Sequence, residues 1–359
     1  MFKISFLGKT ERYLGIDIGT ASVKVVELSS SKKGVTLENY GERINRVDEK
    51  NIQGELRKKA FFSSDEEVAA SIKDILDEAK IKTKEAIFSI PDFMSFFTVF
   101  TIPPMPKDEI SSVVQFEARQ HIPLSLQEMT LDWSLIDDKD EKDSKKRGHK
   151  VLLVAVPNKM IQKYQKIAQM AGITVSAIEA EVFSLARAAI KPEDMAKTVQ
   201  LIDIGVQSTT ITMIRDGVIR ATYSVDFAVG EIIKDLAGIL KISYNEAEKM
   251  IREKGLEDEK IGEFLQLQVG DLASESKQVS ANYFKHEKRE TDKIIVAGGT
   301  ALMTGLPGLL TRQAGKPTET VDPFSNIAYP PILEDVIKEM GPRYSVVVGL
   351  TLRYIENKK

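Results

Sequence analysis

The hydrophobic pattern of the first 90 residues predicts several strands and one helix. Apolar residues alternate with polar ones or run continuously, as in half-buried and buried strands, over 14–18, 22–28, 35–44 and 85–90. Between the last two of these stretches, residues 64–80 repeat apolar positions at helical spacing. Ser64 and the acidic residues after it are typical of a helix start, so we expect the helix to begin there.

Residues 84–172 have the pattern of a small α+β insertion. Their apolar stretches predict strands at 96–102, 122–136 and 150–157 and helices at 107–121 and 158–172. The run "DDKDEKDSKKRGHK" between the last two strands is so rich in charge that we expect a solvated loop there.

The second half of the chain again places strands before helices. We expect paired strands within 199–214, a strand at 218–227, helices over 230–286, a strand, turn and helix over 293–315, and a final helix at 344–357. The long helical stretch should break near Ser243 and Gly255. The length suits about two domains of ~150 residues, and we expect them at 1–190, with the insertion, and at 191–359.

Composition narrows the chemistry that the chain can perform. Its 359 residues are 42% hydrophobic and 29% charged, which is ordinary for a soluble globular protein. The absence of cysteine excludes disulfides, thiolate metal sites and cysteine nucleophiles, and the three histidines lack the spacing of metal ligands. The net charge of −3 argues against a nucleic-acid-binding surface across the molecule. No apolar run approaches the ~20 residues of a membrane span, and we expect a cytoplasmic protein.

Two stretches half a chain apart, "GIDIGTASVKVVEL" and "LIDIGVQSTTITMI", share one pattern. In each, an aspartate (Asp17 or Asp203) ends an apolar strand, and a glycine and small polar residues lead into a second strand. A buried strand seldom tolerates an aspartate unless its charge is paired, hydrogen-bonded or bound to a metal. One copy alone is most simply an ordinary hairpin turn. Two copies favour a duplicated α/β architecture in which both hairpins face one cleft.

The residue types in these turns suit a phosphate and a divalent cation. Gly19 and Gly205 let the backbone approach a ligand closely, and the hydroxyls and backbone N–H groups beside them can form an anion-binding concavity. An aspartate next to bound phosphate makes electrostatic sense with Mg²⁺ between them. Neither a Walker A nor a G-x-G-x-x-G pattern occurs, so a P-loop or Rossmann site has no support.

With "VAGGTAL", these stretches resemble the actin-like ATPase superfamily, which includes actin, the heat-shock chaperones, sugar kinases and FtsA. The resemblance implies a duplicated, ribonuclease H-like two-domain α/β fold with a nucleotide cleft, and ATP or ADP with Mg²⁺ as cofactors. The implied first phosphate loop comprises Asp17, Gly19, Thr20, Ala21 and Ser22, with Lys24 reaching the phosphates. The implied second loop comprises Asp203, Gly205, Val206, Gln207, Ser208 and Thr209. Asp17 and Asp203 are the implied metal ligands.

The same resemblance assigns the adenosine end of the cleft. Gly298, Gly299 and Thr300 match the adenosine motif, and Glu248 and Arg252 stand where the superfamily contacts ribose or adenine. Glu248 and Arg252 are four residues apart, so they could equally form a surface ion pair on a helix.

Longer segments resemble one family more closely. "IPDFMSFFTVFTIPPMP", "ARQHIPLSLQEMTLDWSLI", "VLLVAVPNKMIQKYQKIAQMAGI", "ISYNEAEKM" and "VVVGLTLR" look like the PilM family of cytoplasmic type IV pilus assembly proteins. This resemblance implies that a groove beside the insertion receives the N-terminal cytoplasmic peptide of the membrane protein PilN. It also implies recruitment to the inner membrane through partners, further contacts with pilus assembly components, and a possible homo-oligomer.

Hydrolysis of a bound nucleotide needs an oriented water as well as phosphate and Mg²⁺ binding. The candidates are Gln207 in the second loop and Glu181, which is placed like the glutamate of the chaperones' "EPTAAA" helix. Glu181 could equally be a helix N-terminal acid that complements the dipole. We therefore expect an ATP-binding adaptor with at most slow hydrolysis. An FtsA-like filament-forming protein and a small-molecule kinase are the alternatives, although no aspartate stands out as the base that a kinase needs.

Overall fold

The computed structural model describes residues 11–44, 64–136 and 148–356, and the described part contains three β-sheets. The first sheet, of six strands, has the order β14-β3-β2-β1-β4-β8. Its strands are β1 (Glu11–Ile18), β2 (Ser22–Ser31), β3 (Gly34–Ile44), β4 (Glu85–Ile90), β8 (Thr174–Ala180) and β14 (Ile327–Ala328). β1, β2 and β3 are antiparallel, whereas β4 and β8 continue from β1 in parallel.

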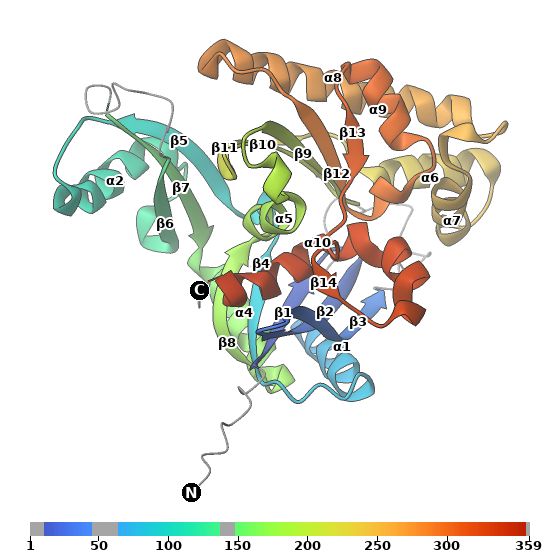
Figure 1. The fold of residues 1–359 in the computed structure, drawn as a ribbon, viewed down its shortest axis with the longest axis horizontal. Helices are drawn as coiled ribbons and strands as arrows, with labels where there is room; N and C mark the ends of the chain where they lie inside the picture. The colour runs from blue at the N-terminus through green and yellow to red at the C-terminus, as the bar shows by residue number, and fades with distance from the viewer. Residues whose placement is uncertain (1–10, 45–63, 137–147, 357–359) are drawn as a thin grey trace, which may run out of the picture.

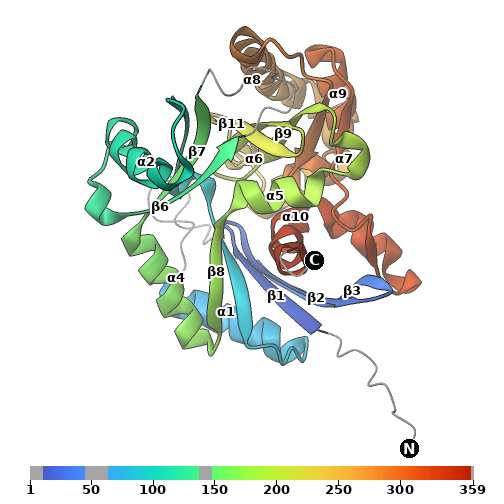
Figure 2. The same ribbon diagram turned by 60° about the vertical axis from the view of Figure 1, so that its left-hand side comes forward.

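Helices cover both faces of the first sheet (Figures 1 and 2). On one face, α1 (Asp65–Glu78) and α4 (Asn158–Ala171) pack on Leu14 and Ile16 of β1. On the other face, α10 (Glu334–Glu356) packs on β1 and β2, while α5 (Glu181–Ala189) crosses α10. Gly15 makes the close approach of α10 possible, because a Cβ there would lie 2.7 Å from the carbonyl oxygen of Val347.

The start of α1 confirms the prediction made from Ser64. The Ser64 hydroxyl accepts a hydrogen bond from the Glu67 N–H, and the Glu67 carboxylate accepts one from the Ser64 N–H. This capping box satisfies two backbone donors that the helix itself cannot pair. The local sequence alone therefore fixes where this helix begins.

The second sheet, of five strands, has the order β11-β10-β9-β12-β13. Its strands are β9 (Thr198–Ile204), β10 (Thr209–Arg215), β11 (Val218–Val225), β12 (Lys293–Ala297) and β13 (Thr318–Thr320). Its accompanying helices are α6 (Val229–Leu240), α7 (Tyr244–Lys254), α8 (Gly262–Glu287) and α9 (Leu306–Ala314). The helical stretch breaks at Ser243, which caps α7, and again at Gly255, as expected.

The expected insertion at 84–172 contains a small sheet of its own. Its sheet has the order β5-β7-β6, formed by β5 (Phe96–Ile102), β6 (Met129–Ile136) and β7 (His149–Pro157), with α2 (Lys107–His121) packed against it. β4 and α4, at the ends of the expected range, belong to the first sheet and its helical layer because Phe88 and Ile167 join the core around β1. We therefore propose 96–157 as the subdomain. Most of the expected charged loop, residues 137–147, lies outside the described residues.

The C-terminal helix also differs from the expectation. α10 begins at Glu334, ten residues before the predicted start, and continues through Pro342. Although it follows the strands of the second sheet in the chain, it packs on the first sheet. Within the described residues, no helix combines the length and the apolar character needed to cross a membrane.

Candidate functional site

One cavity lies between the two large sheets and is lined by residues of both halves of the chain. From the first half, the predicted residues that line it are Asp17, Gly19, Thr20, Ala21, Ser22, Lys24 and Glu181. From the second half they are Asp203, Gly205, Val206, Gln207, Ser208, Glu248, Arg252, Gly298, Gly299 and Thr300. Thr209 is the exception: the side chain of the next residue, Thr210, lines the cavity instead, because successive side chains of a strand point to opposite faces. The structure thus gathers these sequence motifs around one space.

The two predicted loops have the same backbone turn. In the first, the Gly19 N–H donates to the carbonyl oxygen of Ser22 over 3.0 Å, and in the second the Gly205 N–H donates to that of Ser208 over 3.0 Å. A Cβ on Gly205 would lie 2.7 Å from that Ser208 oxygen, so the turn has no room for a side chain. The two hairpins predicted from the sequence are therefore alike in the hydrogen bonds of their turns as well as in their residue pattern.

Asp17 is buried at the end of β1, yet both of its carboxylate oxygens have partners. The Ser89 hydroxyl donates to Oδ1 over 2.6 Å, and the Lys24 ammonium lies 3.6 Å from Oδ2. Ser89 belongs to β4, which pairs with β1 in parallel, so the sheet topology brings it next to Asp17. Sequence reasoning missed Ser89, because no spacing or motif connects it to the first loop.

Asp203 lacks the cross-strand cation that Asp17 has. In the antiparallel register Asp17 faces Lys24, whereas Asp203 faces Thr210. Burial raises the pKa of Asp203 to about 6; the charge of Asp17 adds to this rise, and Lys24 partly offsets it. The second half of the site thus holds an acidic group that a cation in the cavity would stabilise in its ionised form.

Two further acids, Asp92 and Glu181, line the same cavity. Burial raises the pKa of Asp92 to about 7, against a hydrogen bond from the Val182 N–H that lowers it, and the charge of Asp203 raises it further. Burial also raises the pKa of Glu181 well above its usual value, and the charges of Asp17, Asp92 and Asp203 act in the same direction. Asp92 lies in the segment "IPDFMSFFTVFTIPPMP" but was not predicted as a site residue, and it thus joins the predicted acids.

This acidic cluster fits a hydrated Mg²⁺ held together with phosphates. Among the described residues, no group of three or more side chains has the arrangement of a metal site made by protein alone. Mg²⁺ rarely uses such a cage: it keeps several waters and binds one or two carboxylates together with substrate phosphates. Asp17 and Asp203 match that donor set, one from each half.

The wall of the cavity beside Asp203 is shaped by glycines. Gly298 has a φ of +86°, and a Cβ there would lie 2.5 Å from the carbonyl oxygen of Ile204 and 2.8 Å from Oδ1 of Asp203. A Cβ on Gly299 would lie 3.6 Å from the aliphatic part of Arg343. The strand-Gly-Gly turn therefore brings backbone to the cavity wall where a side chain would fill it.

Charged side chains surround this glycine turn. On α7, Nη2 of Arg252 lies 4.0 Å from Oε1 of Glu253, and Arg252 forms no ion pair with Glu248. Arg343 lies 3.4 Å from Glu42, while its buried Nε has no hydrogen-bond partner. Sequence reasoning missed Glu42 and Arg343, since both lie far along the chain from the predicted motifs. The unpaired Nε is a donor that a ligand in the cavity could satisfy.

Comparison with known proteins places this site in a family. A model of the family described as type IV pilus assembly protein PilM matches residues 15–355. The chain belongs to the PilM family. This confirms the resemblance found in its sequence motifs and the assignment to type IV pilus assembly.

Solved structures and a curated relative agree with this assignment. The PilM-PilN type IV pilus biogenesis complex is similar with a TM-score of 0.80 and 22% identity, over 95% of this chain and 98% of that chain. MreB5 of Spiroplasma citri bound to ADP is similar with a TM-score of 0.51 and 12% identity, over 97% of both chains. The cell division protein FtsA of Bacillus subtilis (strain 168) is 21% identical over 329 residues, 84% of this chain and 73% of FtsA. The predicted actin-like fold is confirmed.

Proposed function

We propose that this member of the PilM family is an ATP-binding adaptor of the type IV pilus assembly complex. It would work at the cytoplasmic face of the inner membrane, where it binds the N-terminal cytoplasmic peptide of PilN and couples nucleotide state to that binding. The observation that carries the proposal is that two equivalent Asp-Gly turns, one from each half of the chain, line the same cavity.

Each part of the cavity has a role in holding Mg-ATP. Asp17 and Asp203 would hold the hydrated Mg²⁺, which neutralises phosphate charge when bound. The backbone N–H groups of the two turns and the Lys24 ammonium would hold the phosphates. The adenosine would lie against the Gly298–Gly299 backbone, beside Glu248, Arg252 and Arg343.

Hydrolysis would depend on Glu181 or Gln207, both of which line the cavity. Burial and the neighbouring carboxylates raise the pKa of Glu181, which disfavours the ionised form that a general base needs. Gln207 can orient a water but cannot take up a proton. We therefore infer slow turnover and a protein that uses nucleotide mainly as a conformational ligand.

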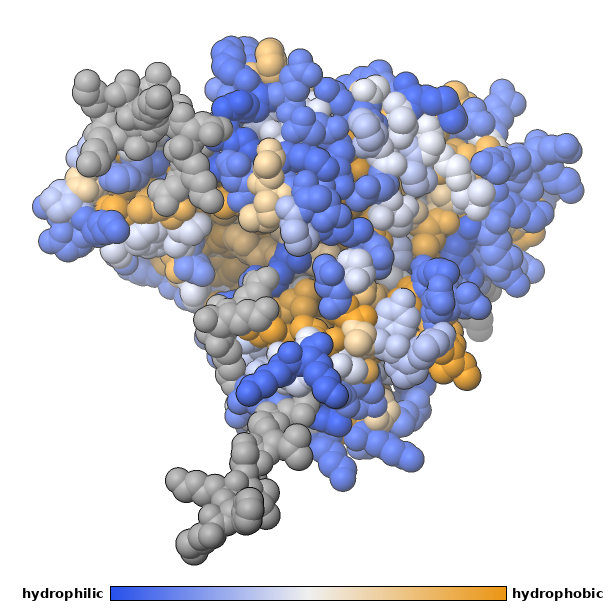
Figure 3. Space-filling view, in the orientation of Figure 1, coloured by the Kyte–Doolittle hydropathy of each residue, from blue (hydrophilic) through white to orange (hydrophobic). Residues whose placement is uncertain are grey.

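A groove beside the inserted subdomain is the proposed peptide site. Figure 3 shows a hollow between the subdomain and the first-sheet half of the molecule, with hydrophobic colour on its floor. The similar solved structure is named as a complex of PilM with PilN, which supports the same partner here. An apolar groove between two moving parts is suited to a short peptide whose affinity responds to closure of the cleft.

Calorimetric titration of the purified chain with Mg-ATP tests the nucleotide part of the proposal. Asp17→Ala and Asp203→Ala should each lower the affinity by roughly a hundredfold or more, because each removes a charge from the proposed cation site. Asp271→Ala on the exposed side of α8 is the matched control and should bind like the native chain. Retained micromolar affinity in both cavity variants, with circular dichroism showing an intact fold, would contradict the proposal.

Fluorescence anisotropy with a labelled peptide from the PilN N-terminus tests the partner. The peptide should bind the native chain, and saturating Mg-ATP should change its affinity. A scrambled peptide of the same composition is the control. Equal binding of both peptides would reject PilN as the occupant of the groove.

A further inference from the structure

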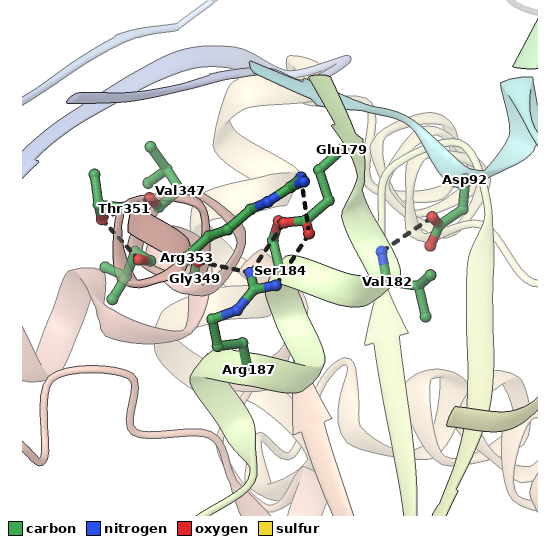
Figure 4. A network of polar contacts seen from close by, with 10 residues as sticks. Asp92, Glu179, Val182, Ser184, Arg187, Val347, Gly349, Thr351 and Arg353 are labelled. Atoms are coloured by element: carbon green, nitrogen blue, oxygen red, sulfur yellow. Dashed lines mark hydrogen bonds and ion pairs between the residues drawn. The ribbon is translucent and has the colours of Figure 1, made fainter. Parts of the chain in front are cut away.

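The first turn of α5 is capped by a residue from a distant segment of the chain. The residue before α5, Ala180, has no side chain that could cap the helix. Instead, Oδ1 of Asp92 accepts a hydrogen bond from the Val182 N–H over 3.0 Å (Figure 4). This bond satisfies a backbone donor that the helix itself cannot pair, from a residue 90 positions away in the chain. Asp92 therefore fixes the position of the helix turn that carries Glu181.

Asp92 also begins the link to the inserted subdomain. It is the first residue of the short helical turn η2 (Asp92–Met94), which connects β4 of the first sheet to β5 of the subdomain. Three residues after η2, Phe97 on β5 contacts Phe183 of α5, with ring centroids 6.3 Å apart. Thus η2 and β5 both rest on the first turn of α5, so movement of this turn would move the base of the subdomain.

The subdomain is held from its other side by the second half of the chain. The Lys150 ammonium on β7 lies 2.9 Å from both carboxylate oxygens of Glu287, at the end of α8. Ile136 and Leu152 of the subdomain share a hydrophobic cluster with Val199 of β9. Closure of the cleft between the two halves would therefore move the subdomain. The subdomain is joined to the first half at η2, which begins at Asp92.

The same junction belongs to the wall of the cavity. The acids Asp92 and Glu181 both line it, next to Asp17 and Asp203. The charge of Asp203 acts on Asp92, and those of Asp17, Asp92 and Asp203 act on Glu181. A cation and phosphates placed at Asp17 and Asp203 would change the electrostatic field on Glu181, and thereby act on the first turn of α5 that Asp92 holds.

We propose that Asp92 is a positioning residue that transmits nucleotide binding from the cavity to the inserted subdomain, by holding the link η2 to the first turn of α5. This inference rests on the proposed nucleotide binding and names how the same site would control the subdomain. Asp92 acts through its side-chain oxygen, which accepts the hydrogen bond from the Val182 N–H. Its negative charge is not required.

Hydrogen exchange of the full chain, measured by mass spectrometry with and without Mg-ATP, tests this role. In the native chain, Mg-ATP should slow exchange both in the two loops and in β5. Asp92→Ala removes the acceptor, so exchange at the start of α5 should rise roughly fivefold, as for loss of a helix cap worth about 1 kcal/mol. Mg-ATP should still protect the loops of this variant but no longer protect β5.

Two further variants separate the acceptor from other effects. Asp92→Asn keeps an oxygen that can accept from the Val182 N–H and should restore the response of β5 to Mg-ATP. Ser64→Ala removes a comparable cap from α1, which packs on the sheet face opposite α5 and α10, and should leave the β5 response unchanged. If Asp92→Ala does not fold, the comparison of Asp92→Asn with the native chain decides the matter.

The outcomes are separable from those of the proposed function. No binding of Mg-ATP by the native chain in calorimetry would reject the proposed function and, with it, the signal that Asp92 would transmit. Binding with no change in β5 exchange would reject the transmission alone. A β5 response that persists in Asp92→Ala, or that is lost in Asp92→Asn, would overturn the role of the Asp92 acceptor.

Discussion

At the scale of single residues, the acids of the cavity differ in how their charges are compensated. Asp17 has the Ser89 hydroxyl and the Lys24 ammonium as partners, whereas Asp92 accepts one backbone hydrogen bond and lies half-buried near Asp203. The cost of burying the charge is therefore offset by polar partners at Asp17, whereas at Asp92 most of it remains and raises the pKa. Such a cost is tolerated where a bound cation would remove it.

The raised pKa of Asp92 predicts a pH-dependent stability. Because its pKa is about 7 in the folded chain and 3.8 without perturbation, the folded state binds more protons between about pH 4 and 7, and stability falls as pH rises through this window. Asp92→Asn lacks this titration, so its stability relative to the native chain should grow from pH 4 to pH 7, by up to roughly 4 kcal/mol. Thermal unfolding without nucleotide at a series of pH values measures this.

Asp194 provides a control because its pKa is shifted in the opposite direction from that of Asp92. Burial would raise the pKa of Asp194, but hydrogen bonds from Lys293 and Lys197 outweigh it and hold the pKa below its usual value. Asp194→Asn should therefore lose stability at neutral pH, and the loss should shrink as the pH falls below about 4. A relative stability of Asp92→Asn that does not change with pH would contradict the buried, protonated state of Asp92.

Gly298 offers a test of the glycine wall of the cavity. Gly298→Ala would place a Cβ 2.5 Å from the Ile204 carbonyl oxygen and 2.8 Å from Asp203, at a φ of +86°. We expect it to destabilise the fold by a few kcal/mol and to weaken Mg-ATP binding, since the second loop must move. Gly315→Ala, at a φ of +70° with no atom within 4 Å, should cost only about 1 kcal/mol and leave binding unchanged. Equal effects of the two on binding would show that close packing at Gly298 is not needed.

At the scale of elements, the crossing of α5 and α10 joins the site to the C-terminal helix. Gly349 of α10 sits directly on the Ser184 backbone of α5, and Arg187 donates both to the Gly349 carbonyl and to Glu179. Arg353 adds a second cation to Glu179 at 3.2 Å (Figure 4). This end of α5 is thus held by packing and charge, while Asp92 holds the other end.

Replacing a glycine at the crossing of α5 and α10 should lower the stability of the fold far more than replacing a glycine at an open helix position. Gly349→Ala would overlap the Ser184 carbonyl oxygen, so the helices must separate, and we expect a loss of about 3 kcal/mol or more. Gly238→Ala on α6 meets no atom within 4 Å and should stabilise by up to about 1 kcal/mol through helix propensity. Chemical denaturation of both variants measures the difference. Similar stability of the two would contradict the close crossing.

At the scale of the whole molecule, the inserted subdomain is part of the first half in sequence, but it packs against the second half. The ion pair of Lys150 with Glu287 and the hydrophobic cluster around Leu152 and Val199 form this contact. If the two halves close on nucleotide as we propose, this contact would carry the motion to the subdomain.

A double-mutant cycle with Lys150→Ala and Glu287→Ala measures the polar part of this contact. The side chains are 32% and 22% exposed, so we expect a coupling energy of about 0.5–1 kcal/mol that weakens with added salt. The exposed pair of Lys338 with Glu334 on α10 is the control and should give only about 0.3 kcal/mol. No coupling between Lys150 and Glu287 would show that this ion pair does not hold the subdomain to the second half.

The sequence by itself determined features that depend on neighbours along the chain. It located the two Asp-Gly hairpins, the cap at Ser64 and the break at Ser243, because turns, caps and strand alternation are local patterns. Since both hairpins carried an aspartate, their repetition also predicted that Asp17 and Asp203 would share a cleft.

Only the tertiary structure decided which distant residues complete the site. Ser89 reaches Asp17 through the parallel pairing of β4 with β1, and Asp92 reaches Val182 across 90 residues of chain. The early start of α10 and its packing on the first sheet were likewise not predicted. Contacts between segments that are far apart in sequence leave no periodic or spacing signal, because they are selected by the packing of whole elements.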